Sequence, residues 1–149
     1  MHEMEFYEHE VEAYEAFEKF AGPFDSIYYM GSGIDRTPSE TLQGEVVHVD
    51  HDPNSVNYLK NQGLDAREQD VTSYRPGKNF DLILISHLTA NSPLIVENMD
   101  DEGAVLCGTE SRARKLDENT ELDLDAVYRD EILQEDPAEV PEAQMYFFR

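Results

Sequence analysis

Residues 26–33 have the sequence Ser-Ile-Tyr-Tyr-Met-Gly-Ser-Gly, and residues 45–50 have the sequence Glu-Val-Val-His-Val-Asp. The β-branched and aromatic residues of both stretches predict two strands. Gly31-Ser32-Gly33 follows the first strand as a glycine-rich turn, and Asp50 ends the second strand, nineteen residues after Gly31. A glycine turn and an acid at the ends of two such strands favour an α/β fold with a ligand site at that edge.

Two short helices are predicted on either side of the second strand. Thr37-Pro38-Ser39-Glu40 carries the signals of a helix start, with Thr37 as the N-cap, Pro38 at the first helical position and Glu40 closing a capping box. Gly44 ends this helix. Asp52-Pro53 caps and opens the next helix, which Gly63 ends.

The alternation of strands and helices continues to residue 108. A weak third strand is predicted over 64–67, and the apolar run at 80–86 is typical of a parallel strand buried on both faces. A short helix from 92 to 99 and a turn at 100–103 lead to a fifth strand at 104–107. The pattern predicts right-handed βαβ units and a doubly wound, mostly parallel α/β sheet.

The two ends of the chain differ from this pattern. Residues 1–22 predict an amphipathic helix that Gly22-Pro23 ends. The C-terminal part, 109–149, contains two predicted strands at 121–129 and 144–149 without a convincing helix between them. We therefore expect a terminal hairpin with an antiparallel last strand, within a single domain spanning 1–149.

The charge of the chain is strongly negative. Its 149 residues include 33 acidic and 11 basic ones, which give a formal net charge of −22. Acids distributed along the whole chain resemble the composition of cytoplasmic proteins from salt-accumulating halophiles; an acidic protein with a basic partner is the alternative. The absence of a basic stripe argues against binding to nucleic acid.

A single cysteine, Cys107, and the absence of a long apolar run or a basic start predict a cytoplasmic protein outside the membrane.

The glycine turn and Asp50 have a chemical interpretation. A turn of this kind lets backbone N–H groups approach a ligand, and an acid at the next strand end can accept hydrogen bonds from both ribose hydroxyls. A dinucleotide site is a weaker alternative, because the usual GxGxxG pattern needs glycine at position 36 and this chain has Arg36.

Residues 28–70 resemble the cofactor-binding half of a class I S-adenosylmethionine (SAM)-dependent methyltransferase, and the likeness extends over 28–108. The resemblance implies a Rossmann-like fold and a nucleotide-type cofactor, SAM or S-adenosylhomocysteine (SAH). In that family the glycine turn holds the methionine part, an acid after the second strand holds the ribose, and an acid after the third meets the adenine. The implied binding residues are Gly31, Ser32 and Gly33 in the turn, Asp50 and His51 after the second strand, Asp70 and Val71 after the third, and Ser86 after the fourth, with His87 as a candidate general base.

Two residues depart from the family pattern beside the glycine turn. Tyr29 stands where the family usually has an acid, and Asp35 stands where a third glycine often follows. We expect Asp35 to replace the missing acid as the partner of the SAM amino group. The fourth strand ends in Ser86-His87-Leu88, unlike the Asn-Pro-Pro-Tyr sequence of amino-group methyltransferases.

Two hypotheses about function follow. The first is a small SAM-dependent methyltransferase, or a methyltransferase-like SAM-binding protein, that transfers a methyl group directly from the sulfonium to a bound nucleophile. The second is a non-catalytic binding or regulatory module that keeps the fold.

His2 and His9 lie among glutamates on a solvated helix end, so no metal site is expected.

Overall fold

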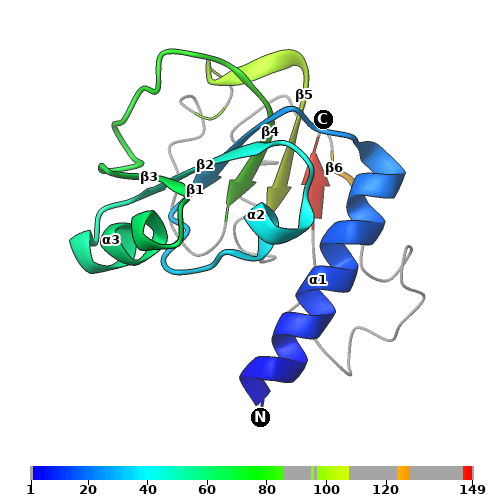
Figure 1. The fold of residues 1–149 in the computed structure, drawn as a ribbon. Helices are drawn as coiled ribbons and strands as arrows, with labels where there is room; N and C mark the ends of the chain where they lie inside the picture. Colours follow the sequence, from blue (N-terminus) through cyan, green and yellow to red (C-terminus); the bar gives the residue numbers. More distant parts are fainter. Residues whose placement is uncertain (1, 86–94, 96, 108–123, 128–145, 149) are drawn as a thin grey trace.

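The computed structural model describes residues 2–85, 95, 97–107, 124–127 and 146–148. Within these residues seven strands form one sheet in the order β3-β2-β1-β4-β5-β7-β6 (Figure 1). The helices are α1 (His2–Ala21), α2 (Thr37–Thr41) and α3 (Pro53–Asn61). The strands are β1 (Ser26–Met30), β2 (Glu45–Asp50), β3 (Asp65–Glu68), β4 (Phe80–Ile85), β5 (Met99–Cys107), β6 (Leu124–Val127) and β7 (Tyr146–Phe148).

The first five strands are parallel, and β1 lies at their centre between β2 and β4. β7 pairs antiparallel with β5 and with β6, so the terminal hairpin extends the sheet beyond β5. The strand order reverses between β1 and β4, which is where open α/β sheets bind ligands at their carboxyl ends. The predicted Rossmann-like, mostly parallel fold is confirmed.

In the described part of the chain, α1, α2 and α3 all lie on one face of the sheet. Tyr29 of β1 pairs with His48 of β2, which pairs with Ala66 of β3, so these three side chains share a face. Phe17 of α1 packs in the same cluster as Tyr29, and Leu59 of α3 packs against Ala66. Figure 1 shows α3 at the β3 side of the sheet and α1 at the opposite side.

The opposite face has its own apolar cluster. Tyr28, Met30 and Ile83 from the strands are buried there together with Val71 and Ile95. Two buried faces explain why β1 and β4 are largely apolar, and the prediction of 80–86 as a strand buried on both faces agrees with the burial of β4.

The long helix α1 ends at Ala21, immediately before Gly22-Pro23 as predicted. Its residues Ala13 and Phe17 are buried while Glu12 and Glu15 are exposed, which is the expected amphipathic division. In the described part of the chain, no helix combines the length and the apolar composition needed to cross a membrane.

Of the two elements predicted between β4 and residue 104, one is wrong and the other lies partly outside the described residues. The predicted turn at 100–103 is wrong: these residues belong to β5. The β4–β5 register is irregular there, because Phe80 pairs with Met99 and Leu82 pairs with Ala104. The extra residues of β5 are thus accommodated inside the strand instead of ending it. The predicted helix at 92–99 lies outside the described residues over 92–94 and at 96.

Candidate ligand site at the carboxyl ends of the parallel strands

The glycine turn after β1 is a tight, left-handed turn. Gly31 has φ 68° and Gly33 has φ 55°, a conformation that glycine adopts without strain. The Gly31 N–H donates to the Val49 carbonyl at 2.8 Å, and the Asp35 N–H donates to the Ser32 carbonyl at 3.1 Å. The side chain of Ser32 is buried inside this turn. The turn is therefore fixed against the end of β2.

Asp50 links the glycine turn to the next loop. Its side-chain Oδ2 accepts a hydrogen bond from the Gly33 N–H at 2.9 Å, and its Oδ1 accepts one from the Asp52 N–H at 2.9 Å. Asp50 is only 7% exposed, and His51 Nδ1 lies 3.7 Å from its Oδ1. A carboxylate has about four lone-pair sites, so Asp50 keeps acceptor capacity after these bonds.

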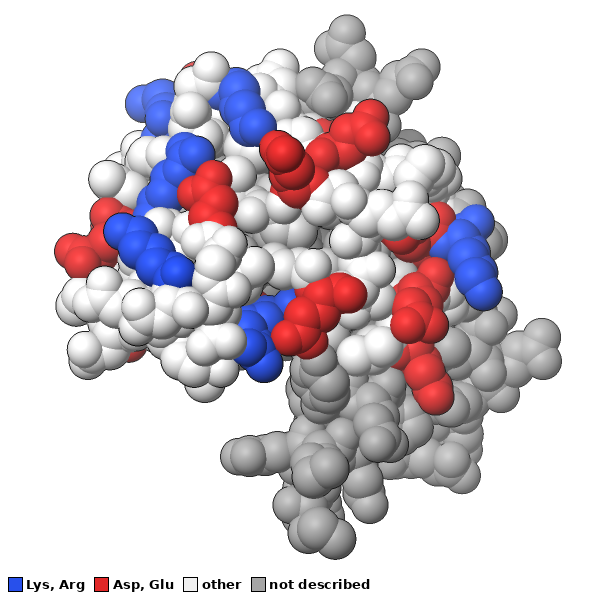
Figure 2. Space-filling view, in the orientation of Figure 1, with Lys and Arg blue, Asp and Glu red and all other residues white. Residues whose placement is uncertain are grey.

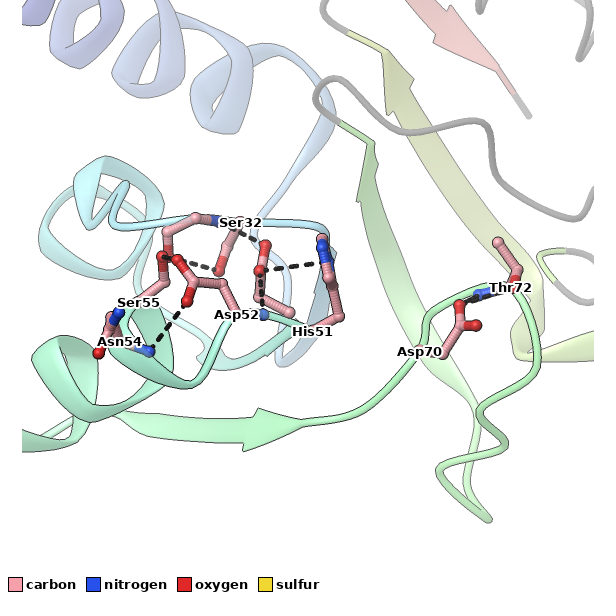
Figure 3. A network of polar contacts seen from close by, with 9 residues as sticks. Ser32, His51, Asp52, Asn54, Ser55, Asp70 and Thr72 are labelled. Carbon is pink, nitrogen blue, oxygen red and sulfur yellow. Dashed lines mark hydrogen bonds and ion pairs between the residues drawn. The ribbon is translucent and has the colours of Figure 1, made fainter.

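Asp52 begins α3, as predicted. Its carboxylate accepts hydrogen bonds from the Asn54 N–H and from the Ser55 hydroxyl, each at 3.0 Å. Figure 3 shows Asp52, Asn54 and Ser55 gathered beside Ser32. This capping arrangement anchors the loop that carries Asp50 and His51.

Asp70 lies at the end of β3, in a loop of its own. Its Oδ1 accepts hydrogen bonds from the Thr72 N–H at 2.9 Å and from the Thr72 hydroxyl at 2.6 Å, and these bonds hold the pKa of Asp70 below its usual range. Nearby His51 lowers this pKa further. In Figure 3, Asp70 and Thr72 stand apart from the Asp52 group, and His51 lies between the two. Val71 is buried in the core, so its side chain supports the loop from beneath.

Tyr29 and Asp35, the two residues that depart from the family pattern, contact each other. The Tyr29 hydroxyl donates to Asp35 Oδ2 at 2.6 Å. Asp35 Oδ1 accepts from the Thr37 N–H at 3.0 Å and from the Thr37 hydroxyl at 2.7 Å. The prediction of Thr37 as N-cap is therefore wrong: Arg36 is the N-cap residue without a side-chain cap bond, and Thr37 is inside α2. The Asp35 side chain thus binds the first backbone N–H of α2, and the Thr37 hydroxyl donates to Asp35 as well.

A buried histidine beneath the turn was missed by the sequence analysis. His48 is fully buried in β2, and its Nε2 lies 2.6 Å from the Ser39 hydroxyl of α2. The Tyr29 ring lies 5.5 Å from the His48 ring between centroids. Burial lowers the pKa of His48 to about 4, against the opposing charges of Asp35 and Asp65. A histidine within an otherwise apolar strand was the available signal.

Several donors that a phosphate would use at the turn are already engaged. The N–H groups of Gly31, Gly33 and Asp35 donate within the protein. The Arg36 guanidinium contacts Gln62 at 2.5 Å and Glu40 at 3.3 Å, and lies over the Tyr58 ring. A dinucleotide pyrophosphate would need such donors free, so the geometry gives that alternative no support.

The predicted site residues thus fall into two groups. Eight of them lie at the carboxyl ends of β1, β2 and β3, with Asp50 as the last residue of β2 and the others in the loops that follow: Gly31, Ser32, Gly33, Asp35, His51, Asp70 and Val71. Ser86 and His87 lie outside the described residues.

No protein-family model matches the sequence, and no curated protein matches it. Solved structures match its fold. The N-methyltransferase NodS from Bradyrhizobium japonicum WM9 is similar with a TM-score of 0.63 and 10% identity over 95% of this chain and 92% of that one. The plantazolicin methyltransferase BpumL in complex with SAH is similar with a TM-score of 0.64 and 9% identity, over 95% of this chain and 82% of that one. The ribosomal protein L11 methylase from Lactobacillus delbrueckii subsp. bulgaricus has a TM-score of 0.64 and 11% identity, over 90% of this chain and 72% of that one.

At these identities the comparisons define the fold. The chain has the Rossmann-like fold of class I SAM-dependent methyltransferases.

Proposed function

We propose that this protein binds SAM at the carboxyl ends of β1, β2 and β3 and acts as a small SAM-dependent methyltransferase. The observation that carries the proposal is the buried Asp50 carboxylate, which is held by the Gly33 and Asp52 N–H groups and retains acceptor capacity. This carboxylate, at the end of β2, lies beside the glycine turn that follows β1. The strand order reverses between β1 and β4, next to that turn. Two proteins of similar fold bind such a ligand: the plantazolicin methyltransferase BpumL is in complex with SAH, and the glycopeptide N-methyltransferase MtfA is in complex with SAM.

The residues present fit an adenosyl ligand in three respects. A Cβ built on Gly33 would meet no atom within 4 Å, so the space beside the turn is open. Asp50 would accept hydrogen bonds from the ribose hydroxyls, and Asp70 with His51 would lie at the adenine end. Gly31, Ser32 and Gly33 would border the methionine part, with Asp35 and Val71 supporting the two ends.

The chemistry assigned to the protein is positioning. Bound SAM would supply an electrophilic methyl group on its sulfonium. The role of the chain is to hold the cofactor and the acceptor in line and to exclude water from them. Ser86 and His87 follow β4 in sequence and are proposed to face the acceptor, with His87 as its general base.

The second candidate is a non-catalytic SAM-binding or regulatory module. The coupled replacement at Tyr29 and Asp35 favours it, because both positions lie at the amino-acid end of the proposed ligand. Binding of SAM without methyl transfer to any acceptor would select this alternative.

The direct test is the substitution Asp50→Ala. It should remove two charge-assisted hydrogen bonds to ribose, each worth roughly 1.5–3 kcal/mol, and so weaken SAM binding by at least about tenfold. Binding is measured by calorimetry with SAM and SAH in molar KCl. The variant Asp50→Asn keeps the shape and, through its amide oxygen, one of the two backbone hydrogen bonds, so it disturbs the fold less than alanine does.

Glu45→Ala is the control, because Glu45 is exposed at the opposite end of β2. Wild-type affinity retained in this variant, together with a loss in both Asp50 variants, supports the adenosyl site. Equal affinity in the wild type and the folded Asp50 variants would place the ligand elsewhere.

A further inference from the structure

The hydroxyl of Tyr28 is a buried polar group on the central strand β1. Tyr28 is fully buried, and its hydroxyl has no hydrogen-bond partner in the described part of the chain. Its ring packs against the ring of Phe80, with 5.1 Å between the ring centroids. A buried hydroxyl without a partner lowers the stability of a fold, and phenylalanine would fill the same space without that cost. The hydroxyl therefore points to a bound partner.

Polar side chains of β3 and of the loop that follows it lie near this hydroxyl. Tyr28 pairs with Val47 and Val47 pairs with Asp65, so the side chains of Tyr28, Asp65 and Arg67 belong to one face of the sheet. Arg67 Nη1 donates to the Tyr74 hydroxyl at 3.0 Å, and Tyr74 packs against the same apolar cluster as Tyr28. Burial raises the pKa of Tyr28, Tyr74 raises it further, and Arg67 opposes the rise. The Tyr28 hydroxyl is thus within electrostatic reach of the Arg67–Tyr74 pair.

The charge of these surroundings favours a neutral guest over an anion. Arg67 Nε and Nη2 each lie 3.3 Å from a carboxylate oxygen of Asp65, so the positive charge of the pair is compensated. The net charge of the chain is −22, which opposes the approach of an anion. Water can donate and accept hydrogen bonds, and buried waters in proteins make about three of them to polar groups that lack other partners. Two phenol hydroxyls and a guanidinium provide partners of this kind.

We propose that a water molecule binds between the Tyr28 hydroxyl and the Arg67–Tyr74 pair and connects the central strand to the loop after β3. Tyr28 positions this water from below. The backbone N–H groups of Ser73 and Tyr74 donate to the Asp70 carbonyl at 3.1 Å and 2.8 Å, so the turn that carries Asp70 is tied to Tyr74. The water therefore supports this turn of the candidate site through Tyr74. This inference does not depend on the binding of SAM.

The substitution Tyr28→Phe tests the proposal, because its effect on stability differs in sign for a paired and an unpaired hydroxyl. Loss of a hydroxyl that is bonded to water should lower the equilibrium constant for folding about fivefold. Loss of an unpaired hydroxyl should leave this constant unchanged or raise it. Denaturant unfolding in molar KCl measures it. Tyr58→Phe is the control, because Tyr58 is 38% exposed and loss of its hydroxyl should have little effect.

Amide hydrogen exchange tests the connection to the loop. In Tyr28→Phe, the amides of Ser73 and Tyr74 should exchange several-fold faster than in the wild type, because the turn loses its support from the central strand. Tyr58→Phe should leave both rates unchanged. Stability in Tyr28→Phe that is equal to or above that of the wild type, or unchanged exchange of both amides, overturns the proposal.

A crystal structure of the wild type grown in bromide identifies the guest. A water oxygen about 2.5–3.0 Å from Tyr28 Oη supports the proposal. An anomalous bromide peak at that position, or a side chain of the protein bonded to the Tyr28 hydroxyl, overturns it.

Discussion

His48 shows how one buried side chain makes the stability depend on pH. Burial lowers its pKa from 6.5 to about 4, so the folded protein keeps it neutral where the unfolded chain is protonated. The stability due to neutral His48 is complete above pH 6.5 and is lost as the pH falls toward 4. The shift corresponds to about 3 kcal/mol of unfolding free energy over that interval.

We predict that denaturant unfolding in molar KCl shows this loss in the wild type and not in His48→Gln. Glutamine has no titrating group and keeps a hydrogen-bonding side chain near Ser39. The many carboxylates titrate in both proteins, so the difference between the two profiles isolates His48. Parallel profiles from pH 7 to pH 4 would contradict the assignment.

The positions of the site residues on their elements could be predicted from the sequence, but their hydrogen-bond partners could not. Asp50 could be placed at a strand end from the pattern alone, but its bond to Gly33 joins two loops and depends on the pairing of β1 with β2. The contact between Tyr29 and Asp35 was hidden for the same reason. A pattern of residue types locates a side chain on an element; its hydrogen-bond partners follow from tertiary structure.

At the scale of elements, the best predicted segments were those with the strongest local signals. The apolar runs of β1, β2 and β4 defined their own strands, and Gly22-Pro23 ended α1. The acidic stretch at 100–103 was predicted as a turn because its residue types favour turns, but it lies inside β5 at an irregularity of the β4–β5 register. β5 pairs with β4 at Met99 and again from Ala104, and this long-range pairing on both sides of the stretch cannot be recognised from local residue preferences.

The helix α3 gives a prediction about the cap at Asp52. Asp52→Ala removes the acceptor for Asn54 and Ser55 and should lower the free energy of unfolding by about 0.5–2 kcal/mol. Val56 and Leu59 are buried through α3, so loosening its first turn also loosens the core. Denaturant unfolding measures the change, and Glu68→Ala, which removes an equal charge from an exposed position, should have little effect. A loss no larger than that of the control would refute the capping role.

At the scale of the molecule, the dominant property is the net charge of −22. Figure 2 shows basic residues on this face mainly on the side of α3 and β3, the elements that carry Lys60 and Arg67, with further basic residues at the lower middle and at the opposite side. Acidic residues are spread across the same face, among the basic ones as well as apart from them. Self-repulsion on this scale destabilises the compact state unless salt screens it.

We therefore predict that the midpoint of thermal unfolding rises as KCl is increased from millimolar to molar concentration. The Debye length falls from about 30 Å at 0.01 M to about 3 Å at 1 M, which removes most long-range repulsion. A sodium chloride series separates screening from a specific effect of potassium. A midpoint that stays constant across both series would argue against adaptation to high salt.

The same screening removes the repulsion between separate copies of the protein, and the edge strand β3 then becomes important. This strand has only four residues, Asp65 to Glu68, and three of them are charged. A short, charged edge is a poor template for the addition of a foreign strand. The sheet therefore keeps a local barrier to edge-to-edge aggregation under the salty conditions in which its overall charge no longer holds other copies at a distance.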